Sequence, residues 1–256
     1  MSGHSKWETT RRQKSVNDSK RAKSFTKVLK NIVSVVKRGG GNVDANFLLK
    51  LAIDRAKEAN VPSSSIESAI SKGLGTNVDG KVFEEVFYEA LGPKGVSILI
   101  QCFTDNRTRL ISELRVAVER NGGRMLDNGS ISWQFELQYI FYLQIGSSQD
   151  SISLSWNKEN KRKVVDVEAF ELSLMDIPGV LDFSLSKDAL EIFVNPGYYN
   201  DFKNYLDSEN YDILDIEVSY IPKVKLEIND TEGDNLLDFI SKIEDIDEVK
   251  DVYINV

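Results

Sequence analysis

The spacing of apolar residues changes near Gly80, and this change constrains the fold of the 256-residue chain more than any other feature. Before Gly80, apolar residues recur at the i, i+3, i+4, i+7 intervals of amphipathic helices. After it, stretches rich in β-branched and aromatic residues alternate with helical stretches. The sequence therefore predicts an all-helical N-terminal module followed by α+β structure.

The first predicted helix runs from about Asn17 to Lys37 or Arg38. Its apolar stripe consists of Phe25, Val28, Leu29, Ile32, Val33 and Val36. At about 100° per residue, the lysines of this segment fall on the opposite face. The glycines at 39–41 lack the Lys-Ser/Thr and the preceding strand of a phosphate-binding loop, so we interpret them as a hinge or helix C-cap.

Capping residues predict where the next two helices begin. Asn42 or Asp44 can cap a second helix, which ends before Pro62. A capping box from Ser64 to Glu67 predicts the start of a short third helix. We expect Gly73 to close that helix as a C′ glycine.

Beyond Gly80, strands are predicted at 82–91 and 96–104, separated by a Gly-Pro-Lys-Gly turn. Thr104 or Asp105 can cap the following helix, which the glycines at 122 and 123 close. Residues 130–145 indicate a strand or a hairpin, and 146–163 an exposed loop. The remaining predicted elements are a helix around 166–175, strands near 180–185 and 190–195, a helix at 198–209, a strand at 212–221, and a β-α-β unit of 224–228, 232–245 and 249–256. This order favours α+β layers, and two such units fit within 81–256.

Charge is strongly segregated along the chain, although the net charge is only −8. Residues 1–38 carry 11 Lys/Arg against two Asp/Glu, a net charge of +9. Residues 137–256 carry 10 Lys/Arg against 25 Asp/Glu, a net charge of −15. Such segregation indicates one end that binds a polyanion and another that is solvated or faces a protein partner.

The candidate phosphate-binding residues lie mainly in this basic N-terminal segment. They are Lys6, Arg11, Arg12, Lys14, Lys20, Arg21, Lys23, Lys27, Lys30, Lys37 and Arg38, with Arg107 and Arg109 at the start of a later helix. The competing interpretation of the segment is a solvated helix face. For the later pair, Asp105 can neutralise the cations internally, or a bound phosphate can do so. Trp7 can either stack on an unpaired base or anchor the segment.

Catalytic and metal chemistry has little support in the sequence. One His and one Cys cannot build a His/Cys zinc site. Cys102 alternates with apolar strand residues and is expected to be a buried, inert thiol. The acidic pairs at 84/85 and 245/247 are expected on exposed faces. No apolar run approaches the roughly 18 residues of a membrane helix, and no secretory signal is visible. We therefore expect a non-enzymatic protein with no metal, cofactor or membrane association.

Several motifs resemble those of the YebC/PmpR family. They are Met-x-Gly-His-Ser-Lys-Trp7, the block at 18–27, the glycines at 39–41, Asp44-Ala-Asn46, the stretch from 52 to Pro62, Tyr88-Glu89, the turn at 92–96, the segment at 104–107, the glycines at 122–123 and Val252-Tyr253-x-Asn255. The resemblance is most specific over 1–135 and weakest over 136–215. Glu136 begins a stretch that replaces the family's usual Arg-Lys-Gly turn.

The resemblance implies a helical domain at 1–80, a middle α+β domain at 81–131 plus 220–256, and an inserted acidic α+β domain at 132–219, both of the latter ferredoxin-like. It also implies a bacterial cytoplasmic transcriptional regulator that binds promoter DNA. The alternative is a ribosome-associated translation factor that assists difficult peptide sequences, with ribosomal RNA as its partner. A protein-only adaptor that uses the acidic C-terminal part is a third possibility.

Overall fold

The computed structural model describes residues 21–76, 83–144, 170, 173–186 and 189–256. These residues fall into two compact units. One unit lies within Leu137–Tyr220, and the other combines the described parts of Lys14–Glu136 with Ile221–Val256. The larger unit therefore contains both the helical module and the first sheet, and the smaller unit contains the second sheet.

The helical module has an apolar core that its three described helices share. These are α2 (Arg21–Gly39), α3 (Phe47–Glu58) and α4 (Ser63–Leu74). Ile32 and Leu49 are fully buried at the centre of this core. Val33 and Val36 also belong to it, as the helical period predicts. The chain turns after α2 at Gly40, whose positive φ of 81° favours glycine, so the predicted C-cap role of the glycine run is confirmed.

The N-cap of α3 is Asn46, and the predicted caps Asn42 and Asp44 are wrong. Asn46 Oδ1 accepts a hydrogen bond from the backbone N–H of Leu49 at 3.1 Å. Its Nδ2 donates to the carbonyls of Val35 (3.2 Å) and Gly40 (2.8 Å). The local pattern cannot distinguish three nearby Asn and Asp residues, but only Asn46 also satisfies carbonyls at the end of α2.

The start and end of α4 differ from the prediction. The N-cap is Pro62, which forms no side-chain cap, and Ser64 lies inside the helix, so no capping box forms. Gly73 also lies within the helix, which ends at Leu74 before a left-handed Gly75. A Cβ at position 73 would lie 2.6 Å from Val36 Cβ. Gly73 therefore allows close packing of α4 against α2.

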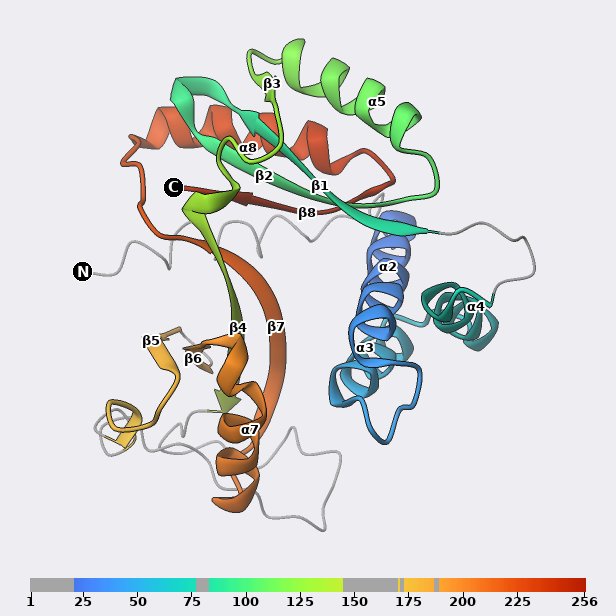
Figure 1. The fold of residues 1–256 in the computed structure, drawn as a ribbon, viewed down its shortest axis with the longest axis vertical. Coiled ribbons are helices and arrows are strands. Elements are labelled where there is room, and N and C mark those ends of the chain that lie inside the picture. Colours follow the sequence, from blue (N-terminus) through green and yellow to red (C-terminus); the bar gives the residue numbers. More distant parts are fainter. Residues whose placement is uncertain (1–20, 77–82, 145–169, 171–172, 187–188) are drawn as a thin grey trace. The chain divides into compact units, whose positions relative to one another are not determined.

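The first sheet, sheet A, is antiparallel with strand order β3-β1-β2-β8. Its strands are β1 (Glu84–Leu91), β2 (Ser97–Thr104), β3 (Arg124–Leu126) and β8 (Val249–Ile254). The helices α5 (Arg107–Glu119) and α8 (Asp230–Glu244) contact each other and lie together beside this sheet (Figure 1). Every residue of β2 is buried, as expected of a strand covered on both faces.

Sheet A confirms the strands predicted at 96–104 and 249–256 and corrects three other details. The N-cap of α5 is Asn106 rather than Thr104 or Asp105, because Asn106 Oδ1 accepts from the N–H of Arg109 at 3.0 Å. Strand β3 was not predicted, and three residues are too few to show a period. Residues 224–228 are not a strand. Within that stretch, Leu226 N–H bonds the Asn255 carbonyl at 2.6 Å, and Val224 is exposed.

The second sheet, sheet B, forms the smaller unit with strand order β5-β6-β4-β7. Its strands are β4 (Phe135–Gln144), β5 (Val180–Leu185), β6 (Ala189–Val194) and β7 (Ile213–Pro222), and the helix α7 (Tyr199–Ser208) packs with it. Residues 135–144 are one strand rather than a hairpin. Phe141 of β4 meets Phe202 of α7 edge to face, with ring centroids 4.9 Å apart.

The fold class predicted from the sequence, an all-helical N-terminal region followed by α+β structure, is confirmed. The three domains and their boundaries at 80, 131 and 219 stay a prediction. The exposed loop at 146–163 lies outside the described residues, as does most of the helix around 166–175.

A buried carboxylate ties the loop after β3 to sheet A. Glu89 is 4% exposed and accepts hydrogen bonds from the backbone N–H groups of Ile131 (2.6 Å), Gly129 (2.6 Å) and Ser132 (3.2 Å). Burial by itself raises the pKa of Glu89, but these donors favour the charged form more strongly. The net result is a pKa below the ordinary carboxyl value.

Replacing Glu89 with Gln is expected to lower the free energy of unfolding by about 1–3 kcal/mol at pH 7, because the amide nitrogen cannot accept a backbone N–H. A lowered folded pKa means that the carboxylate stabilises the fold above the unfolded value and loses this effect as pH falls through the folded value. Urea titrations should show the difference between parent and variant shrinking from pH 7 toward pH 3. The exposed Glu113→Gln is the control. An undiminished difference at low pH would contradict this role.

Candidate nucleic-acid interface

The structure describes five of the 13 predicted phosphate-binding side chains. Lys6, Arg11, Arg12, Lys14 and Lys20 lie outside the described residues. Arg21, Lys23 and Lys27 belong to α2, but their side chains are also outside the description. The remaining five are Lys30, Lys37, Arg38, Arg107 and Arg109. Each of these five contacts another part of the larger unit.

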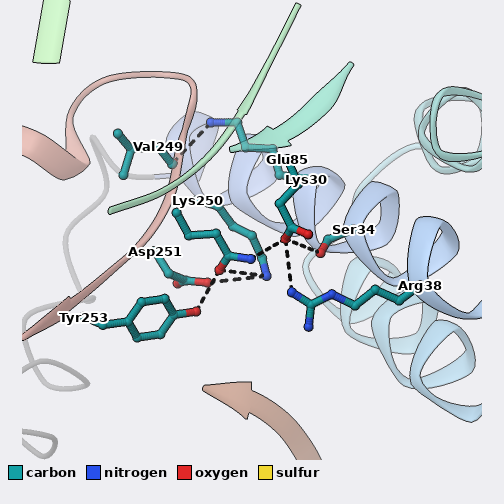
Figure 2. A network of polar contacts seen from close by, with 9 residues as sticks. Lys30, Ser34, Arg38, Glu85, Val249, Lys250, Asp251 and Tyr253 are labelled. Carbon is teal, nitrogen blue, oxygen red and sulfur yellow. Dashed lines mark hydrogen bonds and ion pairs between the residues drawn. The ribbon is translucent and has the colours of Figure 1, made fainter. Parts of the chain in front are cut away.

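The second half of α2 places its polar face against sheet A rather than fully in solvent. Lys30 Nζ donates to the Val249 carbonyl at 3.4 Å (Figure 2). Lys37 Nζ donates to the Phe83 carbonyl and lies 5.2 Å from the centroid of the Phe103 ring. Arg38 Nη2 lies 3.1 Å from Glu85 Oε1. The period of α2 predicts this polar face, but it does not predict what lies opposite.

The two arginines of α5 are neutralised by carboxylates. Arg107 forms a bidentate ion pair with Glu84, in which Nε lies 2.5 Å from Oε1 and Nη2 lies 2.5 Å from Oε2. Arg109 pairs with Asp105 at 3.3 Å and also with Glu248. These hydrogen bonds lower the pKa of Glu84 and raise the pKa of both arginines. The sequence left two ways to neutralise Arg107 and Arg109, by Asp105 or by a bound phosphate. In the structure the charges are neutralised internally, and Asp105 supplies only part of this.

Of the two acidic pairs singled out in the sequence, one is exposed and the other is engaged by arginines. Asp245 and Asp247 are exposed, as predicted. Glu84 and Glu85 are half-buried and engaged by arginines, so the prediction of an exposed face is wrong for them. The partners of these carboxylates are distant in the sequence, and no local pattern signals them. Cys102 is fully buried, and burial raises the pKa of its thiol, which agrees with an inert cysteine.

A cleft of about 1000 Å³ lies between the helical module and the α+β part of the larger unit. Its apolar lining includes Leu29, Phe83 and Phe103. The charged lining residues are Lys30, Lys72, Arg109, Asp105, Glu113, Asp245, Asp247 and Glu248. Carboxylates outnumber cations here, and Arg109 is already paired with two of them. The interior of the cleft is therefore poorly suited to a polyanion.

Four cations of the helical module, Lys50, Arg55, Lys57 and Lys72, were not among the predicted site residues. Lys50 and Lys57 are exposed on α3, and Lys57 lies 3.6 Å from Asp54. The charge count over 39–80 is nearly balanced, so it gave no signal for them.

The described residues offer neither a metal site nor a membrane-spanning helix. Within them, no group of three or more His, Cys, Asp or Glu side chains is arranged to hold a metal ion. None of the helices in this part of the chain combines the length and apolar character that crossing a bilayer requires.

These features define a class of protein with a basic helical N-terminal region joined to acidic α+β structure that has two antiparallel sheets. The chain belongs to the TACO1/YebC family. Residues 5–76 match the model of the TACO1/YebC protein N-terminal domain, and residues 83–256 match that of the TACO1/YebC second and third domain.

Relatives match this chain over its full length. A protein of Dictyoglomus thermophilum is 34% identical over 255 residues, covering 100% of this chain and 95% of that protein. One of Cutibacterium acnes is 36% identical over 259 residues, with 100% and 95% covered. Both are named probable transcriptional regulatory protein. The crystal structure of a conserved hypothetical protein from Aquifex aeolicus matches with a TM-score of 0.71 and 29% identity, covering 93% of this chain and 90% of that one.

Proposed function

We propose that this chain is a non-enzymatic, DNA-binding transcriptional regulator that docks on phosphates through its N-terminal segment. The observation that carries the proposal is the 11 Lys/Arg against two Asp/Glu in residues 1–38 of a chain with a net charge of −8. Clustered cations without nearby carboxylates bind polyanions because each neutralised phosphate releases condensed counterions. The names of the full-length relatives support a regulatory role.

The eight cations from Lys6 to Lys27 form the main docking surface in this proposal. The other five, Lys30, Lys37, Arg38, Arg107 and Arg109, already hold intramolecular partners and are secondary in this proposal. Phosphate contacts position a protein on the duplex but do not read its sequence. We therefore expect binding that is similar across unrelated duplexes. The acidic residues of 137–256 would repel DNA and face a protein partner.

Binding to duplex DNA should depend steeply on salt. If the segment contacts about six phosphates, log K is expected to fall with log salt at a slope of about −5. Fluorescence anisotropy with two unrelated 30-base-pair duplexes, between 50 and 300 mM salt, measures this slope. A slope near zero would contradict electrostatic docking.

The same titration distinguishes the translation-factor alternative. Unlabelled ribosomal RNA serves as a competitor, and sedimentation with ribosomes in a cell extract serves as a second readout. Weak duplex binding together with tight ribosome association would replace the transcriptional proposal with the ribosomal one. If reversing the charges of the basic N-terminal segment leaves cellular activity intact, the protein-only adaptor would be favoured instead.

A further inference from the structure

We propose that Glu85 competes with DNA phosphate for Arg38. When α2 is packed on sheet A, Glu85 pairs with Arg38, so that α2 offers nucleic acid one cation fewer than its sequence contains. The inference rests on the proposed function and names a regulation of the same surface. The packing of α2 against sheet A and the binding of phosphate by Arg38 then oppose each other.

The carboxylate of Glu85 is the centre of a network between α2 and sheet A. Its Oε1 accepts hydrogen bonds from Ser34 Oγ at 3.3 Å and from Arg38 Nη2 at 3.1 Å (Figure 2). The same oxygen accepts from the side-chain amide of Gln101. The Arg38 and Glu85 side chains are 27% and 22% exposed, so the ion pair is only partly screened by water.

Sheet A holds this carboxylate in place. Glu85 and Phe103 are directly paired in β1 and β2, so Gln101, two residues from Phe103, lies on the same face of the sheet. Gln101 is fully buried, and its Oε1 accepts from the Tyr253 hydroxyl at 2.7 Å. Moving Glu85 away from α2 would disturb this buried chain of hydrogen bonds, which is costly.

A bulge in β8 extends the same network. Gln101 pairs with Asp251 while Cys102 pairs with Val249, so Lys250 is the extra residue between them. Lys250 is 8% exposed, and its Nζ lies 3.5 Å from Gln101 Oε1 and 3.6 Å from Asp251 Oδ2. The irregular strand therefore places an additional donor on the amide that orients Glu85.

A phosphate can reach Arg38 because the residue as a whole is exposed at the end of α2. A guanidinium has five N–H donors, and its pairing with Glu85 uses Nη2. The neighbouring carboxylate nevertheless cancels the positive charge. Counterions condensed on DNA are released when a protein cation neutralises a phosphate. A cation whose charge is already neutralised by a carboxylate releases few of them, so it adds little to salt-dependent affinity. Removing the carboxylate restores that contribution.

The test uses the full chain, a 30-base-pair duplex and the salt dependence of binding. Glu85→Gln removes the charge but keeps an acceptor for Ser34. Its slope of log K against log salt is expected to steepen by about 0.9, which enlarges the affinity loss between 50 and 200 mM salt by about 3.5-fold. Glu67→Gln, an exposed acid of α4, removes the same charge and should leave the slope unchanged. Equal slopes for the two variants would overturn the proposal.

Arg38→Gln provides a second test that does not depend on the folding of the first variant. In the otherwise unchanged chain it should alter the slope by less than about 0.3, whereas in the Glu85→Gln background it should remove the whole gain of about 0.9. A flattening of about 0.9 in the unchanged chain would show that Arg38 already contacts phosphate and would overturn the proposal. A parent chain with no salt-dependent binding would instead refute the proposed function itself.

Discussion

Replacing Lys20, Lys23 and Lys27 together with Gln is expected to flatten the salt dependence of duplex binding by about 2–3 units of slope. At 150 mM salt this corresponds to an affinity loss on the order of 100-fold, because three counterion-releasing contacts disappear. Lys30 is left unchanged because its Nζ bonds the Val249 carbonyl. Gln has nearly the same helix propensity as Lys, so the melting temperature should move little.

A matched control removes three positive charges from elsewhere. Lys203 and Lys242 pair with Asp207 and Asp238 one turn away on their own helices, and Lys223 is exposed after β7. Changing these three residues to Gln makes the net charge equally more negative but should leave the slope within about 0.5 of the parent. Equal losses for both triple variants would mean that overall charge, not the N-terminal segment, governs binding. If the triple variant of Lys20, Lys23 and Lys27 kept the parent's salt dependence, these three lysines would not be part of the DNA-binding surface.

The Ile32→Ala variant should lose about 2–5 kcal/mol of unfolding free energy. Ile32 is fully buried where α2, α3 and α4 meet, and neighbouring Leu49 is also fully buried. Truncation leaves a cavity in the core. Because Gly73 already packs closely against Val36, the helices cannot easily shift to fill it. Chemical denaturation followed by circular dichroism measures the loss.

Ile111→Ala is the control for this change, because it removes the same atoms from a side chain that is 36% exposed on α5. Its cost should stay below about 1 kcal/mol. If the two Ile→Ala variants were equally stable, the helical module would not depend on the packing described for its core. DNA binding by Ile32→Ala, measured at a temperature above its own melting temperature but below that of the parent, also tests whether binding needs a folded α2.

Local patterns were sufficient for much of the fold. The apolar period of α2 identified Ile32, Val33 and Val36 as core residues, and alternation in β2 identified a buried Cys102. The first inference concerns which face of a helix is buried, and side-chain direction there follows from the backbone period alone. Strand β2 is buried on both faces, so the apolar residues around Cys102 were signal enough. The N-terminal charge excess is also a property of the sequence and needs no partner to be recognised.

Capping and glycine roles were less predictable. Asn46 was preferred over Asn42 and Asp44 because its amide also reaches carbonyls of α2 and the following turn. Gly73 looked like a helix end, but it serves a contact with Val36 on another helix. Residues 224–228 have strand-like composition, yet strand formation requires a neighbouring edge to pair with, and the composition contains no information about that edge.

The sequence by itself determined the helical and α+β regions, the buried face of α2, the burial of Cys102 in β2, and the concentration of cations in residues 1–38. Only the tertiary structure decided which cations hold intramolecular partners. Arg38 and Glu85 are 47 residues apart, and Arg109 and Glu248 are 139 apart. Charge counting sums these groups as if each were free, whereas their electrostatic effect depends on distances of a few ångströms that arise only when α2 and β8 meet β1 and β2.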